Sequence, residues 1–251
     1  MKIAVLTGAT SGLGYEFLKH ISDYYPEIEE FWLVSRNKEK IAEIAEQASR
    51  PVKIVALDLT KDESYGLLRR EYDMLKPEIS LLINNSGCGY LGDVGDGEVE
   101  KQIRMIDLNL KGLTAVTHIS IPYMKAGSKI LNVSSIASFC PNPRMTVYSA
   151  SKAFVTAFSF GIGEELKKKK ITCTAVCPGP MDTAFLTSGG IKGNSKTFET
   201  LPYCIPEKVA MGALKAAKKG RSVYTPKFFF KFYRFVAKLV PTKLMMKASK
   251  T

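Results

Sequence analysis

The sequence predicts an α/β protein with a doubly wound sheet of seven parallel strands in a single domain. Short runs of β-branched and apolar residues alternate with helical patterns from the first residues to about residue 225. The runs are continuously apolar, as expected of parallel strands that helices cover on both faces. With 251 residues, 45% of them hydrophobic, the chain can bury the core of one large domain.

Seven runs are the candidate strands, in chain order. They are 2–7 (KIAVLT), 30–35 (EFWLVS), 52–58 (VKIVALD), 79–84 (ISLLIN), 129–135 (KILNVSS), 171–177 (ITCTAVC) and 222–225 (SVYT). Helical patterns fill the intervals, as in 37–48, where Ile41, Ile44 and Ala45 share one face. The irregular stretch 178–205 contains several glycines and is long enough to act as a lid.

The positive charge of the chain lies at its C-terminal end. The formal net charge is +12, yet residues 1–207 carry as many acidic as basic residues. From Lys208 onward there are twelve Lys or Arg residues and no Asp or Glu. This distribution excludes a positive electrostatic field over the whole protein of the kind that binds nucleic acid. It leaves a basic face formed by the C-terminal residues.

Cysteine and histidine content points to a reducing compartment. Five Cys without a CxxC pair, and only two His, disfavour both a disulfide framework and a metal site. The N-terminal residues do not resemble a secretory signal peptide, and no apolar run approaches the length of about 18 residues typical of a membrane-spanning helix. We therefore expect a cytoplasmic protein without a metal.

A glycine-rich loop follows the first strand directly. Residues 7–14 read TGATSGLG and lead into a helical pattern. Glycines permit the tight turn and let a phosphate approach the backbone, while the helix N-terminus supplies N–H donors and a positive dipole. A glycine loop alone is a modest signal, because ordinary strand–helix turns also contain glycine. Its place after the first strand indicates binding of a dinucleotide pyrophosphate.

The second strand ends in Ser35 and Arg36. An acidic residue at this place would bind the ribose hydroxyls of adenosine and favour NAD. A hydroxyl and a guanidinium instead suit the additional 2′-phosphate of NADP. We therefore predict NADP(H), although Arg36 could also be a solvated residue at the start of a helix.

A tyrosine, a lysine and a serine are the candidate catalytic groups. Tyr148 and Lys152 are four residues apart in a helical pattern, so their side chains share one face. The nearby ammonium is expected to lower the pKa of the phenol from its usual value near 10, which would make it an acid or base for a ketone or alcohol. Ser135, predicted as the last residue of its strand, could hold the substrate oxygen.

Together these motifs resemble the short-chain dehydrogenase/reductase family over about residues 1–225. The matching elements, in order, are TGATSGLG, Asp58-Leu59, Asn84-Asn85-Ser86-Gly87, Asn109 in IDLNLKG, Ser135, Tyr148, Lys152, and Pro178-Gly179 with Thr183. Ser86 stands where the family usually has Ala, a small change that affects no catalytic group. The resemblance implies a Rossmann-type fold and an oxidoreductase acting on CH–OH groups.

The resemblance also implies a role for each matching residue. The catalytic tetrad would be Asn109, Ser135, Tyr148 and Lys152, in which Asn109 holds a water that relays protons to Lys152. Lys152 would also bind the nicotinamide ribose. The cofactor-binding residues implied are Gly8, Thr10, Ser11, Gly12, Leu13, Gly14, Ser35, Arg36, Asp58, Leu59, Asn85, Gly87, Tyr148, Lys152, Pro178, Gly179, Met181 and Thr183. A protein of this fold that only binds a dinucleotide or a membrane would be expected to lack the Tyr or the Lys.

The candidate substrate-lining residues are mostly apolar and carry few charges. Ser135, Phe139, Met145, Tyr148 and Phe185 are the principal ones. Such a lining suits a large apolar ketone or secondary alcohol. The Ser35-Arg36 pair, NNSGCGYLG and the C-terminal extension are similar to hydroxysteroid dehydrogenases of bacterial type and to lipid ketone reductases. A steroid or bile acid is the first expectation, and a 3-oxoacyl or long-chain keto lipid is the alternative.

Residues 226–251 form an extension with a basic and an apolar side. KFFFKFYRFVAKLV (227–240) predicts a helix of about four turns that starts at Thr225-Pro226 and stops at Pro241. Lys227, Lys231, Arg234 and Lys238 would form one stripe. The opposite side would consist of Phe228, Phe232, Phe235, Val236 and Leu239, widened by Phe229, Tyr233 and Val240.

Two interpretations of this helix remain open. Its apolar side could pack on its own enzyme, beside the substrate entrance, or on a partner subunit. It could instead lie on an anionic membrane as a peripheral contact. Nucleic acid is disfavoured, because the aromatic residues are segregated from the basic stripe. Family resemblance further implies a homodimer or homotetramer.

Overall fold

Seven parallel strands form one sheet in the order β3-β2-β1-β4-β5-β6-β7 in the computed structural model, which describes residues 1–248. The strands are β1 Lys2–Thr7, β2 Glu30–Ser35, β3 Val52–Ala56, β4 Glu78–Asn84, β5 Lys129–Val133, β6 Thr172–Val176 and β7 Val223–Tyr224. The predicted doubly wound α/β sheet is confirmed. Strand order reverses between β1 and β4, which places a crevice at the carboxyl ends of these two strands.

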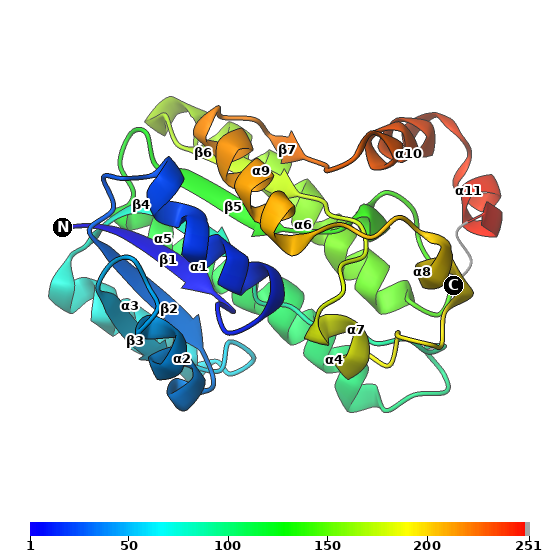
Figure 1. The fold of residues 1–251 in the computed structure, drawn as a ribbon, viewed down its shortest axis with the longest axis horizontal. Coiled ribbons are helices and arrows are strands. Elements are labelled where there is room, and N and C mark those ends of the chain that lie inside the picture. The colour runs from blue at the N-terminus through cyan, green and yellow to red at the C-terminus, as the bar shows by residue number, and fades with distance from the viewer. Residues whose placement is uncertain (249–251) are drawn as a thin grey trace.

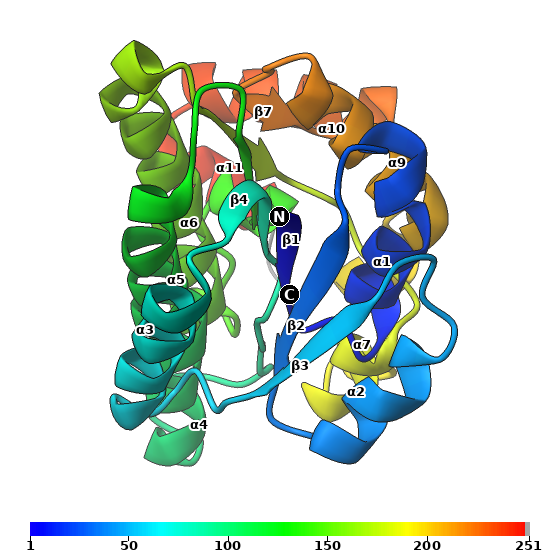
Figure 2. The same ribbon diagram turned by 90° about the vertical axis from the view of Figure 1, so that its left-hand side faces the viewer.

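Helices cover both faces of the sheet (Figure 2). One layer contains α3 (Glu63–Leu75), α4 (Val99–Ile106), α5 (Leu113–Ser120) and α6 (Thr146–Glu165), and the other contains α1 (Gly12–Tyr24), α2 (Lys38–Ala45) and α9 (Pro206–Lys218). A π-helical turn, Asp107–Gly112, joins α4 to α5. Two short helices, α7 (Ala184–Ser188) and α8 (Lys196–Thr200), follow β6 beyond the carboxyl edge of the sheet (Figure 1).

The buried residues of β1 alternate between two cores. Ala4 and Leu6 pack in the core on the side of α1 and α9, whereas Ile3 and Val5 pack with α3 and α5. All four side chains are fully buried. A strand that is buried on both faces needs apolar residues at every position, which explains the continuous run in the sequence.

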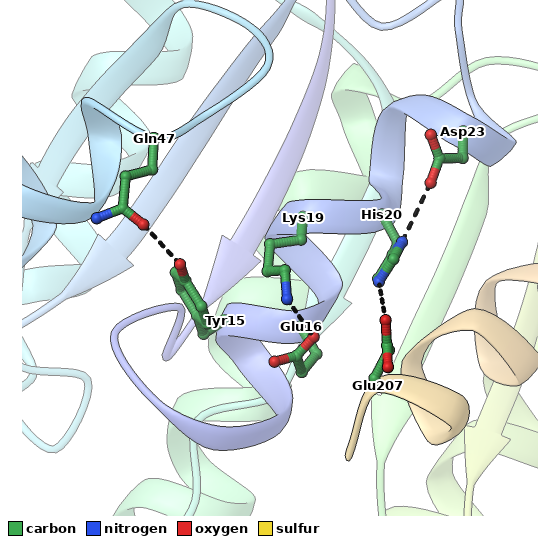
Figure 3. Close-up of polar contacts among 7 residues, drawn as sticks. All are labelled: Tyr15, Glu16, Lys19, His20, Asp23, Gln47 and Glu207. Atoms are coloured by element: carbon green, nitrogen blue, oxygen red, sulfur yellow. Dashed lines mark hydrogen bonds and ion pairs between the residues drawn. The ribbon is translucent and has the colours of Figure 1, made fainter. Parts of the chain in front are cut away.

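Polar contacts on the outer side of α1 tie this helix to its neighbours (Figure 3). The Tyr15 hydroxyl donates to Oε1 of Gln47, just beyond α2, at 2.6 Å. Nδ1 of His20 lies 3.1 Å from Asp23 within α1, whereas its Nε2 reaches a neighbouring helix, 3.6 Å from Glu207 at the start of α9. These contacts help to fix the helix that begins at the glycine loop.

The C-terminal extension folds into two helices, α10 (Phe228–Leu239) and α11 (Thr242–Ala248), beyond the carboxyl edge of the sheet (Figure 1). The predicted start at Pro226 was two residues too early, because Lys227 has a positive φ of 53° that interrupts the helix geometry. The helix therefore has about three turns. It ends just before Pro241, as predicted, and the backbone N–H of Leu244 bonds to the Pro241 carbonyl as α11 begins.

The predicted apolar side of α10 points mostly away from the protein. We call Phe228, Phe232, Phe235 and Leu239 the outer stripe, and their exposed fractions are 82%, 57%, 60% and 68%. Phe230 is instead the fully buried anchor of the helix. The amphipathic pattern is present, but these four residues do not pack on their own protein as the first of the two interpretations expected, because apolar residues occur on both the inner and the outer side of α10.

Candidate active site

A cavity of about 790 Å³ lies at the carboxyl edge of the sheet. The glycine loop, the ends of β2 to β5, the start of α6, the segment after β6, and helices α10 and α11 all contribute to its lining. This is the crevice in which doubly wound folds bind ligands. Most of the residues that sequence motifs single out meet here.

The glycine loop has the geometry of a phosphate-binding turn. Gly8 and Gly12 adopt φ values of 69° and 53°, which side chains disfavour. A Cβ on Gly14 would lie 2.0 Å from the carbonyl oxygen of Gly8, so the turn requires a glycine there. Thr10, Ser11, Gly12 and Leu13 line the cavity, and α1 begins at Gly12. The first turn of α1 is therefore well placed for a pyrophosphate.

Asn85 holds the glycine loop in place. Its side-chain Nδ2 donates to the carbonyl oxygens of Thr7 at 3.2 Å and Gly8 at 2.9 Å. The backbone N–H groups of Asn85 and Ser86 both donate to Oγ1 of Thr7 at 3.0 Å. Asn85 also lines the cavity, so one residue both borders the ligand space and shapes the loop.

Cationic and anionic groups meet at the end of the cavity beside β2 and β3. Ser35, Arg36 and Asp58 line the wall together with Leu59. Burial alone would raise the pKa of Asp58, but hydrogen bonds from Thr60 and the charges of Arg36 and Arg104 lower it overall. Asp58 thus stays ionised, and the exposed Arg36 faces the region where an adenosine would lie.

Ser135, Tyr148 and Lys152 all line the cavity. Nζ of Lys152 donates to the Val133 carbonyl at 2.9 Å and lies 5.8 Å from the centroid of the Tyr148 ring. The exposed fractions of Tyr148 and Lys152 are only 7% and 5%. A Cβ on Gly87 would lie 3.3 Å from this Nζ, so the glycine leaves the lysine its space.

The pKa of Tyr148 differs from the prediction. Burial raises it to about 12, and a side-chain hydrogen bond with Ser135 only partly opposes this effect. Burial lowers the pKa of Lys152 to about 8. The expected lowering of the tyrosine pKa is wrong for this geometry, because desolvation dominates and the Lys152 ammonium donates to Val133 instead of to the phenol. At neutral pH the site thus holds a protonated phenol that can act as an acid.

Ser135 was predicted as the last residue of its strand, but β5 ends at Val133, two residues earlier. Its hydroxyl accepts a hydrogen bond from the Ala137 backbone N–H at 3.1 Å, at the start of the 3₁₀ turn Ile136–Ser138. The turn holds the hydroxyl beside Tyr148 at the cavity wall.

The Asn109 side chain is fully engaged and does not line the cavity. Its Oδ1 accepts from the Cys88 backbone N–H at 2.9 Å, and its Nδ2 donates to the Cys88 carbonyl at 2.8 Å and to Ser151 Oγ at 3.0 Å. Asn109 lies in the π-helical turn, a feature often found at functional sites. It therefore positions the cavity wall near Lys152 through backbone contacts.

The segment after β6 closes the cavity over the glycine loop. Pro178, Gly179, Met181 and Thr183, which the family resemblance assigned to the cofactor, all line it. The Thr183 side chain lies 3.2 Å from a Cβ built on Gly12. The parts of the expected dinucleotide site for the pyrophosphate and for the nicotinamide are therefore neighbours in space although far apart in the chain.

Of the predicted substrate residues, Phe185 lines the cavity and its ring centroid lies 5.5 Å from that of Tyr148. Phe139 and Met145 do not, which corrects the prediction. Met145 is buried in the apolar cluster that also contains Tyr148 and Leu186. The ring of Phe139 instead contacts Tyr233 of α10, which takes the place at the cavity wall that the sequence assigned to Phe139.

Several lining residues were not identified from the sequence. The side chains of α10 and α11 that line the cavity are Phe229, Phe230, Tyr233, Val236 and Met245. Arg104 of α4 also lines it, and its Nη2 is buried without a hydrogen-bond partner among residues 1–248. None of these belongs to a family motif, and only the amphipathic C-terminal pattern hinted at the first group.

Other kinds of site were also sought in the described part of the chain. Among residues 1–248, no three His, Cys, Asp or Glu side chains gather so as to hold a metal ion. None of the helices described there is long and apolar enough to cross a membrane.

Comparisons with known proteins identify the family of the chain. The family model described as short chain dehydrogenase matches residues 2–190. An uncharacterized oxidoreductase of Staphylococcus epidermidis is 33% identical over 201 residues, covering 79% of this chain and 85% of the relative. A very-long-chain 3-oxoacyl-CoA reductase of Anas platyrhynchos is 37% identical over 188 residues, covering 70% of this chain and 58% of the relative.

Solved structures share the fold. A short-chain dehydrogenase of Sphingobium yanoikuyae, in complex with NADPH, superimposes with a TM-score of 0.81 at 23% identity, covering 98% of this chain and 95% of that one. A 3-ketoacyl-(acyl-carrier-protein) reductase of Brucella melitensis, complexed with NADH, gives a TM-score of 0.75 at 22% identity, covering 90% and 96%. The match of the family model over most of the chain shows that the protein belongs to the short-chain dehydrogenase family and is an oxidoreductase acting on CH–OH groups.

Proposed function

We propose that the protein reduces the carbonyl of a bulky apolar substrate, with NADPH as the hydride donor. The observation that carries this proposal is the meeting of Tyr148, Ser135 and Lys152 at one cavity wall, with a largely apolar lining beside them. The cavity is large enough for a drug-sized or lipid-like molecule.

The residues present fit a nicotinamide dinucleotide. The glycine loop offers the N-terminus of α1 to a pyrophosphate, and Gly14 keeps the turn close to the backbone of Gly8. Arg36 supports the choice of NADP(H), because its guanidinium matches a 2′-phosphate and no carboxylate follows β2 in its place. Asp58 and Leu59 would border the adenine.

Each catalytic residue has a distinct task in the proposed reaction. A bound nicotinamide supplies the hydride. The Tyr148 phenol gives its proton to the carbonyl oxygen, and the Ser135 hydroxyl hydrogen-bonds that oxygen as negative charge develops. Lys152 holds a positive charge near the phenol and passes a proton back to it. The Asn109 backbone carbonyl, in its π-helical turn, would hold the water of this relay, because the side chain is engaged elsewhere.

Two substrate classes merit testing. The relative that reduces very-long-chain 3-oxoacyl-CoA supports a 3-oxoacyl thioester. The aromatic wall formed by Phe185 and Tyr233 equally suits the flat face of a steroid or bile acid. A substrate of either class would bind with one carbonyl beside Tyr148 and with its long apolar part along the cavity lining.

A substrate screen tests the proposal. Purified protein with NADPH is offered keto steroids, keto bile acids and 3-oxoacyl thioesters of increasing chain length, and cofactor oxidation is followed. We expect turnover of at least one class, with higher kcat/KM for longer or bulkier members. Absence of turnover with every carbonyl, together with measurable NADPH binding, would overturn the proposed activity.

We also propose a cytoplasmic homo-oligomer in which residues 178–205 act as a lid on the catalytic domain of residues 1–225. The odd number of cysteines supports a reducing compartment. Ile103 and Ile106 of α4 and Phe154 of the adjacent α6 are exposed, which supports pairing through these two helices. Light scattering on the purified protein measures the oligomeric state directly.

A further inference from the structure

The outer stripe of α10 is an apolar surface without an obvious partner in the protein itself. Phe228, Phe232, Phe235 and Leu239 follow one another at the spacing of a single helix face, and each is more than half exposed. Leu244 of α11 is also 56% exposed. Several large apolar side chains on one solvent-facing helix mark a surface that contacts something else.

Basic residues flank this stripe on one side. Lys231 and Lys238 are exposed and lie about a quarter of a turn around α10 from the outer stripe, and Lys227 is exposed directly before the helix. On α11, Lys243 and Lys247 are exposed as well. No Asp or Glu follows Glu207 in the sequence, so no acidic side chain of this region compensates the positive charge.

The other flank of the outer stripe leads into the cavity. Phe229 is half exposed and lines the cavity. Val236 and Tyr233, on the same flank of α10, line the cavity as well. Met245 of α11 adds a buried apolar side chain to the same wall. An apolar surface thus runs from solvent, over one edge of α10, to the space beside Phe185 and Tyr148.

We propose that α10 and α11 rest on an anionic lipid bilayer, so that the cavity receives its apolar substrate from the membrane. The outer stripe enters the boundary between headgroups and acyl chains, while the flanking lysines contact anionic headgroups. A helix of 12 residues is too short to span a bilayer, so α10 lies in the plane of the interface.

Charge favours this occupant over a second copy of the chain. A symmetric dimer through the outer stripe would bring the same flanking lysines of both copies together. The region after Glu207 contains no carboxylate side chain to neutralise them. An anionic lipid surface supplies both the apolar interior and the negative charge that this face lacks.

Vesicle binding tests the docking itself. Full-length protein is mixed with vesicles of neutral phosphatidylcholine, or of phosphatidylcholine with about one third anionic phosphatidylglycerol, and the bound fraction is measured by flotation. We expect binding to the anionic vesicles to exceed binding to the neutral ones by at least about tenfold, and to weaken with added salt. Equal partition into both, or binding to neither, would overturn the proposal.

Two variants separate the apolar and basic contributions. F228S/F232S/F235S/L239S removes the outer stripe and is expected to lower vesicle partition at least about tenfold. K227Q/K231Q/K238Q is expected to abolish the preference for anionic lipid. The matched control L67S/M74S/L75S changes exposed apolar residues on α3 and should bind vesicles like the parent. Equal losses in the control and the outer-stripe variant would contradict a specific docking face.

A second readout concerns substrate access and rests on the proposed carbonyl reduction. The outer-stripe residues do not line the cavity, so their variant should reduce a water-soluble short ketone at the parental rate. Reduction of a ketone embedded in anionic vesicles should fall at least about tenfold. If the protein reduces no ketone, the vesicle-binding result still decides the docking, so the two failures are distinguishable. A different outcome is that the parent protein binds neither kind of vesicle and the outer-stripe variant has another oligomeric state than the parent in the absence of lipid. That outcome would assign the outer stripe to contact with a second copy of the chain.

Discussion

The aromatic ring of Phe230 lies directly against the α-carbon of Gly179. A Cβ built on Gly179 would come within 2.3 Å of the Phe230 ring, and Phe230 is fully buried. Because Gly179 lies in the segment that also borders the expected nicotinamide, this contact joins the C-terminal extension to the cofactor site. Helix α10 is thus part of the wall of the candidate active site.

Phe230→Ala should therefore both destabilise the protein and disturb the cavity. Loss of a fully buried phenylalanine lowers the free energy of unfolding by about 3–5 kcal/mol. Thermal unfolding measures this loss, with Phe228→Ala on the exposed face as the control, for which we expect a change of about 0.5 kcal/mol or less. Similar unfolding temperatures for the two variants would contradict the anchoring role of Phe230.

Gly14→Ala should abolish cofactor binding. Its Cβ would lie 2.0 Å from the Gly8 carbonyl oxygen, so the glycine loop must change shape. The matched control is Gly161→Ala in α6, where the new Cβ meets no atom within 4 Å. This control should bind NADPH normally and gain about 0.4–1 kcal/mol of stability. Fluorescence titration with NADPH measures both variants, and unchanged affinity in Gly14→Ala would refute the assigned loop.

Arg36→Ala should shift cofactor preference from NADPH toward NADH. A charge-assisted hydrogen bond to the 2′-phosphate contributes about 1.5–3 kcal/mol, so its loss weakens NADPH binding on the order of 10- to 100-fold. NADH affinity should not change. The control is Lys38→Ala, which removes a positive charge two residues further along the chain and should leave the affinities for NADPH and NADH unaltered. If the parent binds NADH as tightly as NADPH, the assignment of Arg36 is wrong.

The strands and the meeting of the candidate catalytic groups could be predicted from the sequence, because each leaves a local signal. Parallel strands buried on both faces read as apolar runs, and the Tyr148–Lys152 spacing depends on one helix only. The direction in which α10 docks had no such signal. With apolar residues on both its inner and outer sides, only the space beside Gly179 decides that Phe230 faces inward.

Contacts between segments that are far apart in the chain could likewise not be predicted from the sequence. Phe139 seemed a lining residue from its distance to Tyr148 along the chain, but Tyr233 of α10 stands at the wall beside it. The pKa of Tyr148 depends on how deeply it is buried, which the motif does not state. Arg104 reaches the cavity from α4 without belonging to any motif.

The pH dependence should differ between the two reaction directions. Tyr148, with a pKa of about 12, stays protonated through neutral and mildly alkaline pH and can donate its proton for reduction. Lys152, with a pKa of about 8, loses its charge above that pH. Reduction should therefore be constant below about pH 8 and fall above it, by up to about tenfold per pH unit, whereas alcohol oxidation should rise with pH. Profiles of kcat/KM in both directions check this, and a reduction rate that rises through pH 8 to 10 would contradict it.

The most direct test of the account is the rate of carbonyl reduction by Tyr148→Phe. This variant removes only the hydroxyl that is proposed to give its proton to the substrate. We predict that kcat falls by about 10²–10⁴-fold while NADPH affinity and unfolding temperature remain those of the parent. Retention of the parental kcat by a folded, NADPH-binding Tyr148→Phe protein would contradict the central claim.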